Sequence, residues 1–96
     1  MLVIVSYDVN IKSIGGQRRL RRVAKICKDF GQRVQFSVFE CLVDPTQWTL
    51  MRKKLIEEID PERDSLRFYF LGSNWKQHIE HIGAKEVIDL EDILIF

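Results

Sequence analysis

Cysteine and proline are scarce in this chain, with two of each among 96 residues, and no apolar run approaches the roughly 20 residues of a membrane-spanning helix. Cys27 and Cys41 are too few and too poorly spaced for a disulfide framework or a zinc site. We therefore expect two reduced thiols in the core. The N-terminal residues lack the basic, apolar and cleavage regions of a signal peptide, so a cytoplasmic protein is expected.

The formal net charge of +1 conceals an uneven distribution of charge along the chain. Residues 1–43 contain eight Lys and Arg against three acids, a balance of +5. Residues 44–96 contain seven Lys and Arg against eleven acids, a balance of −4. The basic half indicates an anionic partner such as nucleic acid, and the acidic half is compatible with a basic partner.

Two segments have the features of helices. In residues 18–30 the apolar side chains recur at helical spacing, and Gly31 stands where a left-handed C-cap belongs. Residues 44–47, Asp-Pro-Thr-Gln, combine a capping aspartate, a proline suited to the first helical position and a glutamine that completes a capping box. This second helix is expected to end at Asp60-Pro61.

Strands are predicted where apolar residues form short β-branched runs or alternate with polar ones. Residues 2–9 and 65–71 each predict one strand. Residues 33–43 alternate at first but lose the pattern from Phe39, which predicts either two strands or one long bent strand. Residues 75–82 are expected to form a short helical segment.

This order of elements, β-α-β(β)-α-β followed by a C-terminal tail, predicts an α+β fold. A ferredoxin-like βαββαβ sandwich fits it, as one domain over residues 1–96. Both helices would then cover one face of an antiparallel sheet. Phe39, Tyr69 and Leu71 are expected on the other face, where a second copy of the chain would cover them.

Asp8, at the end of the first predicted strand, is the candidate catalytic and metal-binding residue. A carboxylate there is placed beside a loop, and Mg²⁺ needs only one or two carboxylates because it keeps several waters. A metal at such a site can promote attack on phosphorus. The alternative is an aspartate that caps the following loop or pairs with an arginine, and spacing alone favours that role.

Basic residues predict a nucleic-acid surface on the first helix. Their spacing places them along one exposed side, where like charges repel unless an anion binds them. Nothing in the pattern reads bases, so sequence preference should be weak. The polar stripe Arg33, Gln35 and Ser37 could line a phosphate groove or face solvent. The candidate nucleic-acid-binding residues are Arg18, Arg19, Arg22, Lys25, Arg33 and Ser37, with Arg21 and Lys28 on the same side of the helix.

His78 and His81 are three residues apart and could form a metal pair. No cysteine or acid completes a ligand set at a familiar spacing, so two surface histidines are expected instead. The chain also has no P-loop and no GxGxxG motif.

These segments together resemble the CRISPR-associated endonuclease Cas-two family (CRISPR-associated protein two) over nearly the whole chain. The resemblance rests on a first strand ending in Tyr-Asp-Val (7–9), a basic helix ending at Gly31, the run RVQFSVFE (33–40), and DSLRFYFL (64–71) followed by Gly72. It implies a homodimer whose sheets pack face to face. It also implies that Asp8 from both subunits binds Mg²⁺ or Mn²⁺, and that residues 87–96 add a strand to the partner's sheet.

The resemblance further implies a metal-dependent endonuclease that hydrolyses phosphodiester bonds in double-stranded DNA, single-stranded RNA or both. It would act in CRISPR adaptive immunity, taking part in spacer acquisition with the CRISPR integrase (CRISPR-associated protein one). Two alternatives stay open on sequence. One is a non-catalytic DNA-binding adaptor of the integrase complex, and the other is a toxin-like ribonuclease of the same fold.

Overall fold

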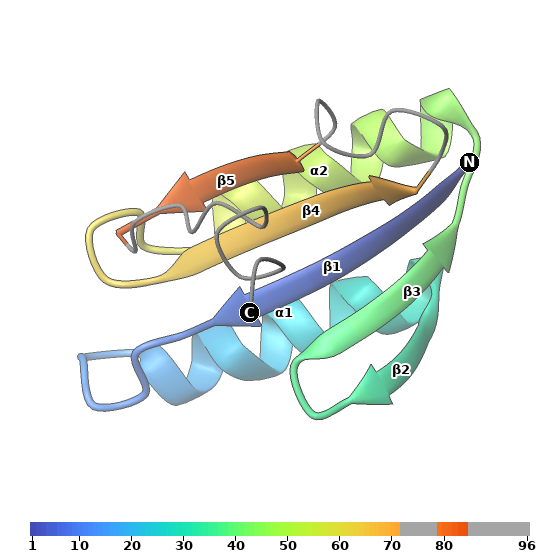
Figure 1. Cartoon of the computed structure of the whole chain (residues 1–96). Coiled ribbons are helices and arrows are strands. Elements are labelled where there is room, and N and C mark those ends of the chain that lie inside the picture. Colours follow the sequence, from blue (N-terminus) through green and yellow to red (C-terminus); the bar gives the residue numbers. More distant parts are fainter. Residues whose placement is uncertain (72–78, 85–96) are drawn as a thin grey trace, which may run out of the picture.

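The computed structural model describes residues 1–71 and 79–84 (Figure 1). The elements are β1 (Leu2–Asp8), α1 (Gly16–Phe30), β2 (Gln32–Gln35), β3 (Val38–Leu42), α2 (Pro45–Glu58), β4 (Ser65–Leu71) and β5 (Ile79–Gly83). They build an antiparallel sheet of strand order β2-β3-β1-β4-β5. The first four strands in that order, with the two helices, confirm the predicted α+β, ferredoxin-like fold, and β5 extends the sheet beyond β4.

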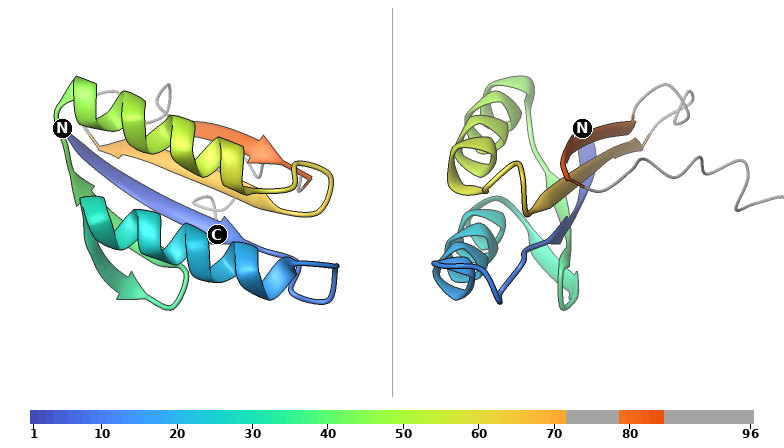
Figure 2. Two further views of the ribbon diagram at one scale, coloured as in Figure 1. Left: turned by 180° about the vertical axis from the view of Figure 1, so that it is seen from behind. Right: turned by 90° about the vertical axis from the view of Figure 1, so that its left-hand side faces the viewer.

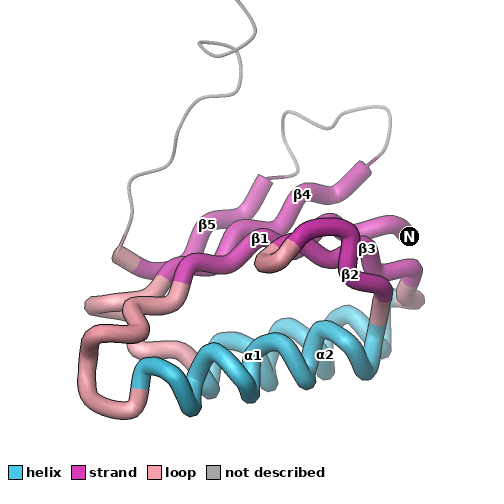
Figure 3. The backbone as a smooth tube through the Cα atoms, turned by 90° about the horizontal axis from the view of Figure 1, so that it is seen from below, coloured by secondary structure: helices cyan, strands magenta, loops and turns pink. Residues whose placement is uncertain are grey.

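Both helices lie on one side of the sheet, so the molecule has two layers (Figures 2 and 3). Burial alternates along the central strand β1, where Val3, Val5 and Tyr7 are buried beneath the helices. The other residues of the strand, which alternate with these from Leu2 to Asp8, point to the opposite side. We call that side, away from the helices, the outer face; within residues 1–71 and 79–84 no element covers it. Neither helix in those residues is long and apolar enough to cross a membrane.

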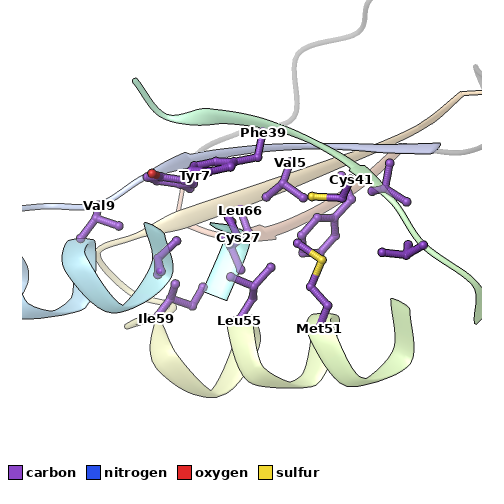
Figure 4. Close-up of a cluster of buried hydrophobic side chains, with 14 residues drawn as sticks. Val5, Tyr7, Val9, Cys27, Phe39, Cys41, Met51, Leu55, Ile59 and Leu66 are labelled. Atoms are coloured by element: carbon purple, nitrogen blue, oxygen red, sulfur yellow. The ribbon is translucent and has the colours of Figure 1, made fainter. Parts of the chain in front are cut away.

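The core lies between the sheet and the helices, with side chains from both layers interleaved (Figure 4). Trp48 of α2 contacts two rings of β4 edge-on, Phe68 at 4.8 Å and Phe70 at 5.2 Å between ring centroids. Cys27 and Cys41 are free and buried, which confirms the prediction of reduced core thiols. Burial raises the pKa of Cys27 to about 12 and that of Cys41 to about 11.

The capping box predicted for the second helix is present. Asp44 accepts a hydrogen bond from the amide of Gln47 at 2.7 Å, and the Gln47 side chain accepts one from the amide of Asp44 at 2.9 Å. The first helix begins at Gly16, two residues before the predicted start. Gly16 packs so closely against the backbone of Asn10 that a Cβ atom would overlap the Asn10 carbonyl oxygen. The start of α1 is therefore fixed by the preceding loop.

Two expectations about the β2–β3 hairpin are wrong. The chain turns at residues 36–37, and the register shifts between Arg33 and Gln35. In β3, Phe39 pairs with Val5 of β1 and is fully buried beneath the helices, not on the outer face. The shift also sets Arg33 opposite Phe39 but Gln35 opposite Val38, so the polar residues do not form one continuous stripe.

The helical segment expected at residues 75–82 is also wrong where the structure tests it. Residues 79–83 form strand β5, which pairs antiparallel with β4 from Ser65↔Gly83 to Tyr69↔Ile79. The edge of β4 offers unpaired backbone groups, and pairing with it overrides the weak local helical preference. Residues 75–78, and the strand expected within 87–96, lie outside the described residues.

Candidate functional site

Asp8 is the last residue of β1 and is exposed. It pairs in register with Ser65, the first residue of β4, and β1 alternation places it on the outer face with Ile4 and Ser6. The strand therefore fixes the backbone that carries this carboxylate. The loop 9–15 begins directly after it and leads to α1.

Asp64 is a second carboxylate close to this strand end, and it is fully buried. Its Oδ1 accepts a hydrogen bond from the amide of Asn10 and its Oδ2 accepts one from the amide of Asp60, both at 2.9 Å. Arg19 donates from Nε to Oδ2 at 2.7 Å and from Nη2 to Oδ1 at 3.3 Å. A charge taken out of water is stable only when it is paired and hydrogen-bonded in this way.

The ionisation of Asp64 reflects competing influences. Burial, the largest single influence, raises the pKa of Asp64. The hydrogen bonds from Arg19 and from the amides of Asp60 and Asn10, with the positive charge of Arg19, together outweigh burial, so the net pKa lies below the ordinary aspartate value. The hydrogen bond with Asp64 in turn raises the pKa of Arg19. Both groups are therefore charged at neutral pH.

Arg19 was predicted to bind phosphate, but its N–H groups donate hydrogen bonds within the chain. Besides the two bonds to Asp64, Nη1 donates to the carbonyl of Ile14 at 2.9 Å and Nη2 donates to the Ser13 hydroxyl at 2.6 Å. Only 14% of the Arg19 side chain is exposed. We therefore assign Arg19 to the loop and not to a phosphate surface.

The other predicted basic residues of α1 are exposed on the side of the helix turned away from the sheet. Arg22 lies 3.5 Å from Glu58 of α2, and Lys25 lies 3.6 Å from Asp29 one turn along. Exposed pairs of this kind are worth little and exchange readily with other anions. Within the described residues Arg18, Arg21 and Lys28 form no ion pair, so this helix presents excess positive charge.

Arg33 and Ser37 lie in the β2–β3 hairpin. The guanidinium of Arg33 lies 5.1 Å from the ring centroid of Phe39 and 5.7 Å from that of Phe36, a cation–π arrangement. The Ser37 carbonyl accepts a hydrogen bond from the amide of Tyr7 at 3.1 Å. The hairpin tip is thus tied to β1 one residue before Asp8.

The structure does not show His78 and His81 close together. His81 lies in β5, where Nε2 is 3.3 Å from the Gly83 carbonyl oxygen, and His78 lies outside the described residues. Across residues 1–71 and 79–84 no group of three or more His, Cys, Asp or Glu could bind a metal ion. A metal site on this part of the chain would therefore need ligands from a second molecule or from water.

Asp8 and the basic side of α1 lie on opposite sides of one chain. Asp8 is on the outer face of the sheet, whereas Arg18 and Arg22 are exposed on α1. Figure 2 shows that α1 lies on the other side of the sheet. A carboxylate on a rigid strand end can bind a hard cation, and a cationic helix can bind a phosphate backbone. The two chemistries are thus separated in space and connected through the loop 9–15.

Asp64 was not among the predicted site residues. In the sequence it stands among the charged residues of a polar turn, Pro61-Glu62-Arg63, and only its burial distinguishes it. One signal was present: an aspartate directly before a predicted buried strand can accept hydrogen bonds from neighbouring loop amides. Arg19, likewise, could not be separated from the neighbouring arginines by spacing alone.

The fold and the site define a class: a small ferredoxin-like protein with a cationic helix layer and one exposed carboxylate at a strand end on the opposite face. Over residues 1–79 the sequence matches the family described as CRISPR associated protein Cas2, and the chain belongs to that family. The resemblance inferred from the sequence is therefore confirmed.

Relatives match the chain over nearly its full length. A protein of Chlorobaculum tepidum named CRISPR-associated endoribonuclease Cas2 is 65% identical over 95 residues, which cover 99% of both chains. A protein of Halalkalibacterium halodurans named CRISPR-associated endonuclease Cas2 is 60% identical and matches over the full length of both. The crystal structure of Streptococcus pyogenes Cas2 at pH 6.5 superposes with a TM-score of 0.70 at 51% identity, covering 83% of this chain and 96% of that one.

Proposed function

We propose that this protein is a metal-dependent endonuclease of CRISPR adaptive immunity that hydrolyses phosphodiester bonds in single-stranded RNA, double-stranded DNA or both. Membership of the Cas2 family and the nuclease names of its relatives support the activity. The observation that carries the proposal is the position of Asp8, an exposed carboxylate at a rigid strand end. The protein would act in the cytoplasm, where its nucleic-acid substrates are met.

The proposed enzyme is a homodimer formed through the outer face. Leu42 and Leu71 are 77% and 51% exposed there, and both pair in register with Leu2 between them. An exposed apolar row of this kind is typical of a surface that another molecule covers. A two-fold contact uses the same surface on both copies, and an axis that passes near Asp8 would bring the two Asp8 carboxylates together.

Asp8 from each subunit would bind the proposed Mg²⁺ or Mn²⁺. One hard carboxylate per chain suits Mg²⁺, which takes one or two carboxylates and keeps several waters, better than it suits zinc. When bound, such a cation offsets the negative charge that develops on the phosphate during hydrolysis. The chain itself places the carboxylate, through the pairing of Asp8 with Ser65.

The adaptor role is a second candidate, favoured by the separation of the basic helix from Asp8. Duplex DNA bound across Arg18, Arg22 and Lys25 would lie on the helix layer, on the opposite side of the chain from Asp8. In this role the protein binds DNA for the CRISPR integrase during spacer acquisition, without cutting. Both roles are compatible in one molecule, and Cas2 membership favours either over a toxin-like ribonuclease.

A matched pair of charge insertions tests the dimer on which the proposal depends. Leu42→Glu places a charge on the outer face, whereas Leu50→Glu places one on α2, where Leu50 is 48% exposed. We expect Leu42→Glu to give monomers by sedimentation analysis and to lose cleavage, with Leu50→Glu unchanged. A wild-type monomer that cleaves, or dimers that persist in Leu42→Glu, would contradict the shared site.

A further inference from the structure

Asp64 joins three segments of the chain that are far apart in sequence. Its carboxylate binds the amide of Asn10 in the loop after β1 and the amide of Asp60 in the loop after α2. Its own carbonyl accepts a hydrogen bond from the amide of Ala84, after β5, at 3.0 Å. One buried residue therefore fixes the ends of β1, α2 and β5 relative to one another.

This network lies directly beside Asp8. Asn10, which donates to Asp64, is two residues after Asp8, and Ser65, which pairs with Asp8, is the residue after Asp64. The backbone that carries the Asp8 carboxylate is thus bound on both sides, by strand pairing at Ser65 and by the hydrogen bond at Asn10. A shift of Asp64 would shift both attachments together.

Arg19 extends the network along the loop. It joins Asp64 to the Ser13 hydroxyl and the Ile14 carbonyl, so two consecutive residues of loop 9–15 are bound by one guanidinium. The Ser13 hydroxyl in turn donates to the Asn10 carbonyl at 2.7 Å. Asn10 is therefore bound to Asp64 directly through its amide and indirectly through Ser13 and Arg19.

The backbone at Gly83 packs closely against the backbone of Asp64. Gly83 has φ of +117°, and a Cβ atom there would overlap the Asp64 carbonyl oxygen. A buried ion pair is weak grounds for stability alone, because well-packed apolar residues of similar volume often serve as well. Apolar residues could not donate or accept the directed bonds that connect these loops, so the polar network is better explained by the position it imposes.

We infer that Asp64 and Arg19 are positioning residues for Asp8: together they fix the loop after β1 and thereby the place of the metal-binding carboxylate. The inference rests on the proposed role of Asp8. It adds two residues that touch neither the metal nor the substrate, and it reassigns Arg19 from phosphate binding to the geometry of the site.

The test compares Asp64→Asn and Arg19→Gln with Glu80→Gln. Asp64→Asn preserves side-chain size while removing the charge, and Arg19→Gln removes the guanidinium and shortens the side chain. Glu80→Gln breaks a different pair between helix and strand, Arg52–Glu80, whose Nε–Oε1 distance is 2.6 Å. Glu80 pairs in register with Phe68, on the helix side of β5, and so lies away from the outer face that carries Asp8. It therefore controls for the loss of an ion pair elsewhere in the same fold.

Two measurements are made at a temperature where all variants are folded: amide NMR of residues 8–14, and Mn²⁺ affinity by electron paramagnetic resonance. We expect faster exchange of the Asn10 amide and shifted Asp8 resonances in Asp64→Asn and Arg19→Gln. We also expect Mn²⁺ affinity to fall by about tenfold in both, as when a partner that orients a metal ligand is lost. Glu80→Gln should match the wild type in both measurements.

Unchanged resonances at Asp8 and Asn10, or changes equal to those of Glu80→Gln, would overturn the inference. A separate outcome would refute the proposed function alone: if the wild type neither binds Mn²⁺ nor cleaves nucleic acid, the nuclease assignment fails. The NMR comparison would then still decide whether Asp64 and Arg19 fix the position of Asp8.

Discussion

Arg19 and Asp64 form a two-point ion pair, with Nε to Oδ2 at 2.7 Å and Nη2 to Oδ1 at 3.3 Å. The Asp64 side chain is completely buried and the Arg19 side chain is 14% exposed. The pair joins helix α1 to the residue that precedes β4, across 45 positions of sequence. It is therefore a tertiary contact between α1 and the loop before β4, not a local surface interaction.

Removal of one partner should be costly. Arg19→Ala leaves the Asp64 charge buried without its cation, and such losses typically cost about 3–5 kcal/mol of unfolding free energy. Arg63→Ala removes an exposed pair with Asp60, 2.8 Å apart, and should cost less than about 1 kcal/mol. Urea unfolding of both variants makes the comparison. Equal losses of unfolding free energy in the two variants would show that the buried pair stabilises the fold no more than the exposed pair.

Acid should remove the contribution of Asp64. Its pKa is lowered in the folded state, so its stabilisation is fully present above the unfolded aspartate value of roughly 3.9 and is lost as pH falls through the lower folded value. Asp64→Asn carries no titrating group there and should lose less stability between about pH 5 and pH 2. Parallel pH profiles of unfolding free energy for the variant and the wild type would contradict this.

The cysteines should be inert in the folded protein. Both are buried, and pKa values of about 12 for Cys27 and about 11 for Cys41 leave almost no thiolate at pH 8. We expect no reaction with a thiol-specific disulfide reagent under native conditions and two equivalents after unfolding in guanidinium chloride. Rapid native labelling of either cysteine would show that the core opens.

Sequence periodicity and capping predicted both helices and the order of the elements through β4, because these depend on local patterns that tertiary packing then satisfied, whereas β5 lies where a helical segment was expected. The side of the sheet that each hairpin residue faces was not predictable in the same way. Phe39 was assigned to the outer face, but it pairs in register with Val5, whose side chain lies beneath the helices, so Phe39 is in the core. Directly paired residues share a face of the sheet, and a pairing between distant segments is not visible in local alternation.

The site was only partly predictable for a related reason. Asp8 could be found because it follows a buried strand, and the structure places it at the exposed end of β1. Asp64 and Arg19 could not be distinguished from turn and surface residues, because their role depends on a contact between distant segments. Burial, the property that sets them apart, is not encoded in any spacing.

The basic side of α1 should carry nucleic-acid binding. Arg18→Glu reverses a charge that has no ion pair within the described residues, and Arg63→Glu makes the same change in the loop before β4. We expect Arg18→Glu to weaken duplex binding several-fold at low salt, with a smaller effect as salt is raised. Arg63→Glu should change the affinity little. Equal losses for both variants in fluorescence anisotropy would indicate binding through net charge alone.

The catalytic role of Asp8 is tested by cleavage with purified wild type and Asp8→Asn, with RNA and duplex DNA, in Mg²⁺ and in EDTA. We predict cleavage by the wild type in Mg²⁺ only, and at least a hundredfold loss, roughly the effect of removing a catalytic group, in Asp8→Asn. The variant should keep the fold, the dimer and the affinity for nucleic acid. Cleavage by Asp8→Asn at the wild-type rate, or wild-type cleavage that persists in EDTA, would contradict this role.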